Sequence, residues 1–101
     1  MAKAIKVIGK FPKSNMKELY SNLTDDKFVK KHFPIKITIK AITERKNKTL
    51  VSAFNIKEWD QPSIVVYSVR DQNIELFHSN IPDDESEKVK NAWNTFFKTI
   101  K

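Results

Sequence analysis

The stretch that decides the fold is residues 83–101, with the sequence DDESEKVKNAWNTFFKTIK. Its apolar residues recur every three or four positions, which is the period of a helix with one broad buried face: Val89, Ala92, Trp93, Phe96, Phe97 and Ile100. Acidic residues begin the stretch and lysines end it, as the helix dipole favours. The pattern predicts a helix over about residues 83–100, with Trp93 and Phe96 buried.

The segment before this helix alternates apolar and polar residues, which is typical of strands. We expect four strands, over residues 35–41, 49–57, 64–70 and 74–79. Strands that follow one another through short polar turns form an antiparallel meander. In the first of them Lys36, Thr38 and Lys40 share the even positions, so we expect them to form one exposed polar face.

The N-terminal third predicts one more strand and two short helices. Residues 4–11 alternate, and Pro12 ends the strand. Asn15 and Glu18 have the spacing of a capping box for a first helix, and Thr24-Asp25-Asp26 caps a second that Pro34 ends. The order β-α-α-β-β-β-β-α predicts a single α+β domain over residues 1–101, in which the C-terminal helix covers an antiparallel sheet of about five strands.

Composition excludes several classes of site. The 101 residues contain no cysteine and one glycine, so disulfides, thiolate metal sites and glycine-rich phosphate loops are excluded. The longest apolar run, residues 64–67, is far shorter than the ~20 residues that span a bilayer. No apolar signal segment follows the first residues, so we expect a cytoplasmic protein.

The charge is unevenly distributed along the chain. The formal net charge is +7, but residues 1–48 contain 13 basic and 4 acidic residues, while residues 49–101 contain 6 basic and 8 acidic ones. This asymmetry indicates a surface for an acidic partner, which is a protein, a nucleic acid or an anionic membrane. The alternative is that the lysines only keep a small domain in solution.

Four segments carry a resemblance to a known family. They are MKELY at residues 16–20, LVSAFNIKEW at 50–59, IELFHSNIP at 74–82 and WNTFF at 93–97. In this order, and with the predicted elements, the chain resembles the C-terminal domain of the activator of heat-shock protein 90 ATPase, within the helix-grip (START and Bet v 1-like) superfamily.

The resemblance implies a co-chaperone-like module that binds heat-shock protein 90 and modulates its ATPase cycle. Separately, we expect a monomer. The chain departs from the family in the segment after the second helix. There the family has a glycine-rich hairpin, which is reduced here to residues 34–41, so that about two strands are lost. The family's N-terminal partner-binding domain has no counterpart in these residues.

No set of residues predicts catalysis. His32 and His78 lack carboxylate or cysteine partners at metal-ligand spacing. We expect His32 on a half-buried helix and His78 on a strand near the sheet edge. The acidic residues of 83–87 lack the spacing of a calcium loop and suit a helix N-terminus. We therefore expect no enzyme activity, no metal and no cofactor.

The aromatic residues have two interpretations. Tyr20, Phe54, Trp93 and Phe96 line either a lipid-like cavity or, as we expect, an ordinary packed core. Trp59 stands between two acidic residues at a strand end, where we expect an exposed apolar anchor for a partner.

Three functions therefore stay open, with the co-chaperone first. The others are a START-like carrier of a small hydrophobic ligand and, third, a basic nucleic-acid-binding module, whose strand lysines lack interleaved stacking aromatics. We expect neither a nucleic-acid nor a membrane partner. The predicted partner-binding residues are Lys36, Lys40, Arg45, Lys46, Lys48 and Trp59.

Overall fold

The computed structural model describes residues 2–45, 48–56, 59 and 61–100. The strands are β1 (Ala2–Lys10), β2 (Thr38–Arg45), β3 (Thr49–Asn55), β4 (Ser63–Val69) and β5 (Asn73–Pro82). The helices are α1 (Met16–Leu23), α2 (Asp26–His32) and α3 (Ser86–Thr99), with short 3₁₀ turns η1 (Lys13–Asn15) and η2 (Asp83–Glu85) before α1 and α3. The predicted α+β class and the order of the elements are confirmed.

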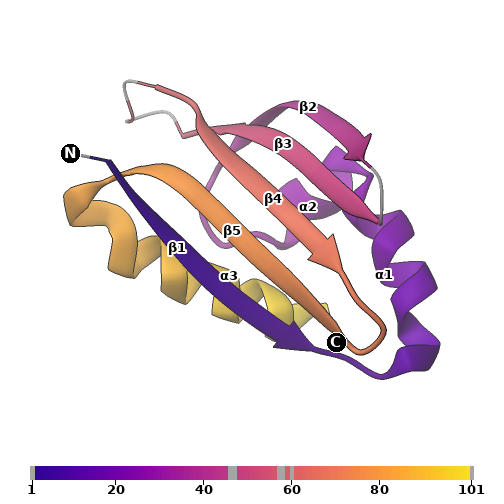
Figure 1. Cartoon of the computed structure of the whole chain (residues 1–101). Coiled ribbons are helices and arrows are strands. Elements are labelled where there is room, and N and C mark those ends of the chain that lie inside the picture. Colours follow the sequence, from indigo (N-terminus) through magenta and orange to yellow (C-terminus); the bar gives the residue numbers. More distant parts are fainter. Residues whose placement is uncertain (1, 46–47, 57–58, 60, 101) are drawn as a thin grey trace.

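The five strands form one antiparallel sheet in the order β1-β5-β4-β3-β2. The strands β2 to β5 are the predicted meander, and the first strand of the chain pairs with the last, so that β1 and β2 form the two edges (Figure 1). Register runs without interruption through the centre of the sheet, from Val51 to Val66 to Phe77.

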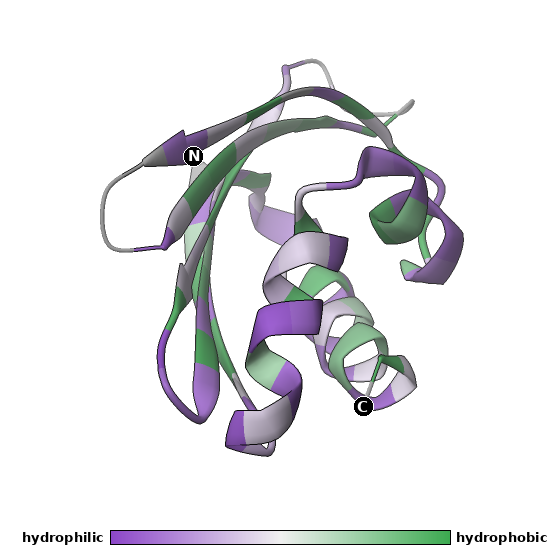
Figure 2. Cartoon of the chain, turned by 90° about the vertical axis from the view of Figure 1, so that its right-hand side faces the viewer, coloured by the Kyte–Doolittle hydropathy of each residue, from purple (hydrophilic) through white to green (hydrophobic). Residues whose placement is uncertain are grey.

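The three helices lie on one side of the curved sheet (Figure 2). Alternation along each strand turns one set of side chains toward these helices, as in β4, where Val65, Tyr67 and Val69 are buried. The helix α3 contributes Val89, Ala92, Trp93, Phe96 and Phe97 to the same core. The predicted broad apolar face of the C-terminal helix therefore packs against the inner face of the sheet.

Strand β2 differs from the prediction. It begins at Thr38 instead of residue 35, and its register with β3 shifts between Ile39 and Ala41. A β-bulge inserts an extra residue, which breaks the two-residue alternation that sequence reasoning assumes. Ile42 is therefore partly buried although it holds an even position.

The predicted helix caps have different outcomes. The Asp25 side chain accepts a hydrogen bond from the backbone N–H of Lys27 at 3.0 Å, as a cap of α2 should. The capping box at Asn15 is wrong, because its side chain makes no capping hydrogen bond. Its backbone is already helical at the end of η1, whereas a capping side chain needs an extended backbone.

The single glycine, Gly9, allows a close approach between β1 and α3. A Cβ atom at this position would lie 2.9 Å from a ring atom of Phe97 and 2.9 Å from a ring atom of Phe11. The Phe97 ring therefore packs directly against the backbone of β1, and its edge-to-face partner is Phe11, with ring centroids 5.8 Å apart.

Candidate partner-binding surface

A chain of buried hydrogen bonds links α3 to the centre of the sheet. The indole N–H of Trp93 donates to Nδ1 of His78 at 2.9 Å, and His78 Nε2 lies 2.7 Å from Oγ of Ser63. Because indole is only a donor, Nδ1 must accept, and the proton of the neutral imidazole is on Nε2. Ser63 then accepts from His78 and donates to the carbonyl oxygen of Phe54 at 3.4 Å.

This arrangement excludes the one serine–histidine contact of the described residues as a catalytic pair. A general base needs an unprotonated nitrogen facing the hydroxyl, whereas His78 presents its N–H to Ser63. Burial lowers the pKa of His78 to about 4, so the imidazole is neutral near pH 7. The expectation of a position near the sheet edge is wrong, because β5 lies inside the sheet and His78 is fully buried. His32 is half-buried on α2, as expected.

The aromatic residues singled out in the sequence fill the space between sheet and helix. Phe54, Trp93 and Phe96 are fully buried, and the Trp93 ring centroid lies 5.7 Å from that of Phe54 and 5.3 Å from that of Phe96. Tyr20 is partly buried at the border of this core, where burial and a hydrogen bond to the Glu44 carboxylate raise its pKa. These rings occupy the volume in which a carried ligand would have to lie.

The predicted basic residues that the structure describes are exposed along β2 and beyond its two ends. Lys36 and Lys40 are exposed near the beginning of β2, and Lys48 is exposed just after its other end. Five residues of β2, or about 17 Å of extended strand, separate Lys40 from the end of the strand at Arg45. The Arg45 side chain and Lys46 lie outside the described residues.

Lys36, Thr38 and Lys40 are all exposed, as expected. Lys36 precedes β2, and Lys40 lies at the bulge, where it lines a shallow hollow with Asp26 of α2. The uninterrupted strand from residue 35 that the prediction assumed is not present, because β2 begins at Thr38 and is bulged before Ala41.

The expectation of an exposed Trp59 is wrong. It is partly buried against the core, its backbone N–H donates to the carbonyl of Ile56 at 2.9 Å, and its ring centroid lies 6.3 Å from that of His78. The large apolar area of an indole favours this folding back at a strand end. Trp59 thus covers the buried histidine from one side.

The exposed apolar surface lies elsewhere, on the outer face of the sheet. The three most exposed large hydrophobic residues of the described chain are Ile8 (48% exposed), Phe77 (41%) and Ile64 (40%). They belong to the neighbouring strands β1, β5 and β4, and the register aligns Phe77 with the partly buried Val66 and Val51. We call these residues the outer apolar patch: Ile8, Val51, Ile64, Val66 and Phe77.

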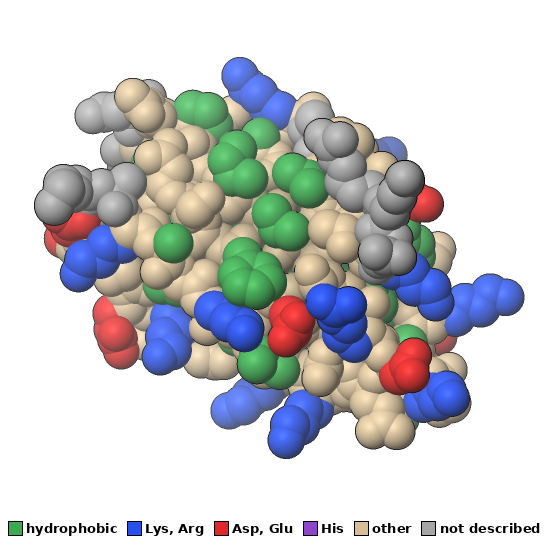
Figure 3. Space-filling model, in the orientation of Figure 1, with side chains coloured by type: hydrophobic (Ala, Val, Ile, Leu, Met, Phe, Trp, Pro, Cys, Tyr) green, Lys and Arg blue, Asp and Glu red, His purple; other side chains and the backbone are tan. Residues whose placement is uncertain are grey.

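Figure 3 shows hydrophobic side chains gathered in the middle of this face, with Lys and Arg side chains along part of its border. The ammonium group of Lys6 lies 5.4 Å from the Phe77 ring centroid. Glu75 lies between two cations, 3.9 Å from Nζ of Lys6 and 3.6 Å from Nε of Arg70. The border of the patch therefore holds more positive than negative charge at these residues.

Sequence reasoning missed both the buried hydrogen bonds of His78 and the outer apolar patch, although the sequence contains a signal for each. Ser63 and His78 occupy inward positions of two alternating strands, but only the register brings them beside Trp93. Phe77 and Ile64 occupy outward positions of the same strands, which the alternation itself predicts.

Comparison of the sequence with models of known protein families gives no match, and comparison with curated proteins also gives none. In the part of the chain that the structure describes, the helices are too short and too polar to pass through a lipid bilayer. Among the described histidine and carboxylate side chains, no group of three is placed to bind a metal ion.

Proposed function

We propose that this chain is a protein-binding module of the helix-grip type, which binds heat-shock protein 90 in the cytoplasm and modulates its ATPase cycle. The family resemblance at residues 16–20, 50–59, 74–82 and 93–97 supplies the partner. The antiparallel sheet packed on a C-terminal helix is compatible with that superfamily.

The observation that carries the proposal is the outer apolar patch with its basic border. An apolar centre gives affinity when it is desolvated against a partner, and a border with a net positive charge directs the approach of a negatively charged surface. The partner surface should therefore combine apolar groups with carboxylates.

The modulation would be a shift between two states of the chaperone. A bound module changes the ATPase cycle only when it contacts the closed, nucleotide-bound state better than the open state. Binding that is stronger with a non-hydrolysable ATP analogue is thus the thermodynamic mark of the proposed function.

The interior supports binding at the surface over the alternative of a carrier. The volume between α3 and the sheet is filled by Phe54, Trp93 and Phe96, each with no exposed area. In this proposal the chain binds and does not catalyse, since the Ser63–His78 contact has the wrong proton arrangement for a nucleophile.

The test is calorimetric titration of the chain into full-length purified heat-shock protein 90, with and without the nucleotide analogue and at two salt concentrations. We expect tighter binding with nucleotide and weaker binding at the higher salt. Phe77→Ser with Ile64→Ser should weaken binding by about tenfold, because both side chains are centres of the patch.

Charge reversal shows whether the predicted basic residues at β2 bind the partner in addition to the outer apolar patch. Lys36→Glu with Lys40→Glu tests the predicted basic residues at β2, and Lys30→Glu on the exposed side of α2 is the single-charge control. Absence of binding heat in every condition would overturn the proposal. Tight binding of a random oligonucleotide would then support the nucleic-acid alternative, and a saturable rise of the melting temperature with fatty acids or sterols would support the carrier.

A further inference from the structure

Strand β1 has an edge that pairs with no other described strand. It is the first strand in the sheet order, and its neighbour is β5. The backbone N–H of Phe11 donates to the carbonyl of Gln72 at 3.0 Å, which continues the register of Lys10 with Asn73 and Gly9 with Ile74. Hydrogen-bonded positions alternate along an antiparallel pair. Ile8 and Lys10 therefore point their backbone N–H and C=O groups toward the free edge.

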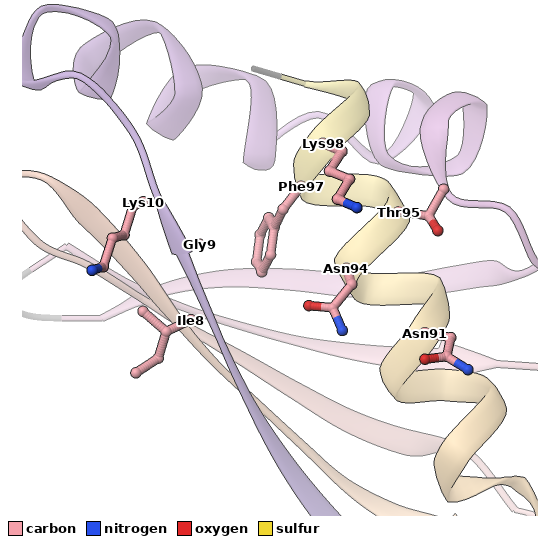
Figure 4. A pocket seen from close by; sticks show the side chains of 8 residues that line it. All are labelled: Ile8, Gly9, Lys10, Asn91, Asn94, Thr95, Phe97 and Lys98. Carbon is pink, nitrogen blue, oxygen red and sulfur yellow. The ribbon is translucent and has the colours of Figure 1, made fainter.

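A groove runs between this edge and α3. Its volume is about 830 Å³, and its lining residues are Ile8, Gly9, Lys10, Asn91, Asn94, Thr95, Phe97 and Lys98. Figure 4 shows Phe97 and Asn94 pointing from α3 toward β1, with Phe97 facing Gly9. Because Gly9 has no Cβ, the Phe97 ring lies directly against the strand and closes the base of the groove, with only 4% of its surface exposed.

The helix side of the groove offers polar groups at helical spacing. Asn91, Asn94, Thr95 and Lys98 lie within two turns on one face of α3 and are all exposed. Among the described residues, the side chains of Asn91 and Asn94 have no hydrogen-bond partner. An amide side chain both donates and accepts, so these two are suited to the polar groups of an extended backbone.

The positive charge of the groove favours an acidic ligand. Lys10 and Lys98 line it, and no lining residue is acidic. Strand β1 also has Lys3 and Lys6 and no acidic residue. Two copies of the chain paired edge to edge through β1 would place these lysines against one another, which is a common protection against self-pairing. An acidic segment would instead be attracted.

We propose that the groove between β1 and α3 binds an extended, acidic segment of a partner protein, which adds to the sheet as a strand beside β1. The segment exchanges backbone hydrogen bonds with Ile8 and Lys10 and pairs its carboxylates with Lys10 and Lys98. The groove borders the outer apolar patch and shares Ile8 with it, but its other wall is α3, and the proposal does not depend on a chaperone partner.

The test uses a fluorescein-labelled synthetic peptide with the sequence EVEVTVE, which is acidic and prone to an extended conformation. Fluorescence anisotropy should show saturable binding to the full chain. A control peptide of the same sequence, N-methylated at alternate backbone nitrogens, should bind at least about tenfold more weakly, because it keeps the side chains and lacks the backbone donors. NMR amide shifts should concentrate in residues 6–10 and 91–98.

Matched charge reversals locate the site. Lys10→Glu with Lys98→Glu should weaken peptide binding by at least about tenfold. Lys30→Glu with Lys31→Glu changes the net charge equally on α2, which packs near β2 at the opposite edge of the sheet, and should change binding less than about twofold. Circular dichroism confirms that both variants are folded.

Several outcomes would overturn the proposal. They are absence of saturation, equal binding of the N-methylated peptide, equal loss in both double variants, and amide shifts confined to other elements. Sedimentation of the free chain tests whether a second copy of the chain occupies the groove. Concentration-dependent association, with NMR amide shifts in β1, would show that it does.

Discussion

The two faces of the sheet contain similar residues in opposite roles. Along β5, Leu76 and His78 are completely buried, while Phe77 between them is 41% exposed. A histidine thus lies in the core and a phenylalanine on the surface, although their hydrophobicities would favour the reverse. The comparison shows that alternation along a strand assigns each side chain to a face, and that the core must then provide hydrogen bonds for any polar group placed in it.

The largest loss of stability is expected from a substitution at the centre of the inner face of the sheet. Trp93→Ala removes a fully buried ring that contacts Phe33, Phe54 and Tyr67 and leaves the Nδ1 atom of His78 without its donor. It should lower the free energy of unfolding by about 3–5 kcal/mol, measured by urea denaturation. Trp59→Ala is the control, since this half-buried indole should cost clearly less. Equal costs would contradict the central position of Trp93.

The second effect is a pH dependence of the inner face. His78 has a pKa of about 4 in the folded chain and an ordinary value of 6.5 when unfolded, so the unfolded chain binds the extra proton between these values. Stability contributed by neutral His78 is therefore complete above pH 6.5 and is lost as the pH falls toward 4, by about 3 kcal/mol.

The variant His78→Gln isolates this contribution. Between pH 7 and 4 its unfolding free energy should fall by less than that of the wild type, because the variant lacks the buried imidazole. Identical slopes for the wild type and His78→Gln would show that the imidazole titrates normally.

A smaller effect, of opposite sign, is expected at Tyr67. Its hydroxyl is buried without a hydrogen-bond partner among the described residues, and burial raises its pKa. Tyr67→Phe removes this unpaired group and should raise the unfolding free energy by about 1 kcal/mol in thermal or urea denaturation. A loss of stability would reveal a partner for the hydroxyl.

The smallest effect is expected on the outer face. Ile64→Thr keeps a β-branched residue at a position that is 40% exposed, so it should change the unfolding free energy by no more than about 0.5 kcal/mol. The adjacent Val65→Thr places a hydroxyl in the core and should cost about 1–2 kcal/mol. Equal costs at these neighbours would remove the distinction between the two faces.

Regular periodicity explains which elements could be predicted. The helix at α3 and the meander of β2 to β5 follow from repeats of 3.6 and two residues, which need no knowledge of distant contacts. The beginning of β2 could not be predicted in the same way, because its bulge depends on pairing with β3. The position of Trp59 depends likewise on distant contacts, because its ring packs against the core beside His78 of β5.

The sequence by itself determined the element order, the apolar face of α3, and the excess of lysine near the N-terminus, since all three are local properties of the chain. The tertiary structure decided which strands form edges, which histidine lies beneath a tryptophan, and where β2 begins and is bulged. The physical reason is that residues 63, 78 and 93 meet only after a register is chosen. Likewise, the groove beside β1 exists only because a helix distant in sequence packs against a glycine.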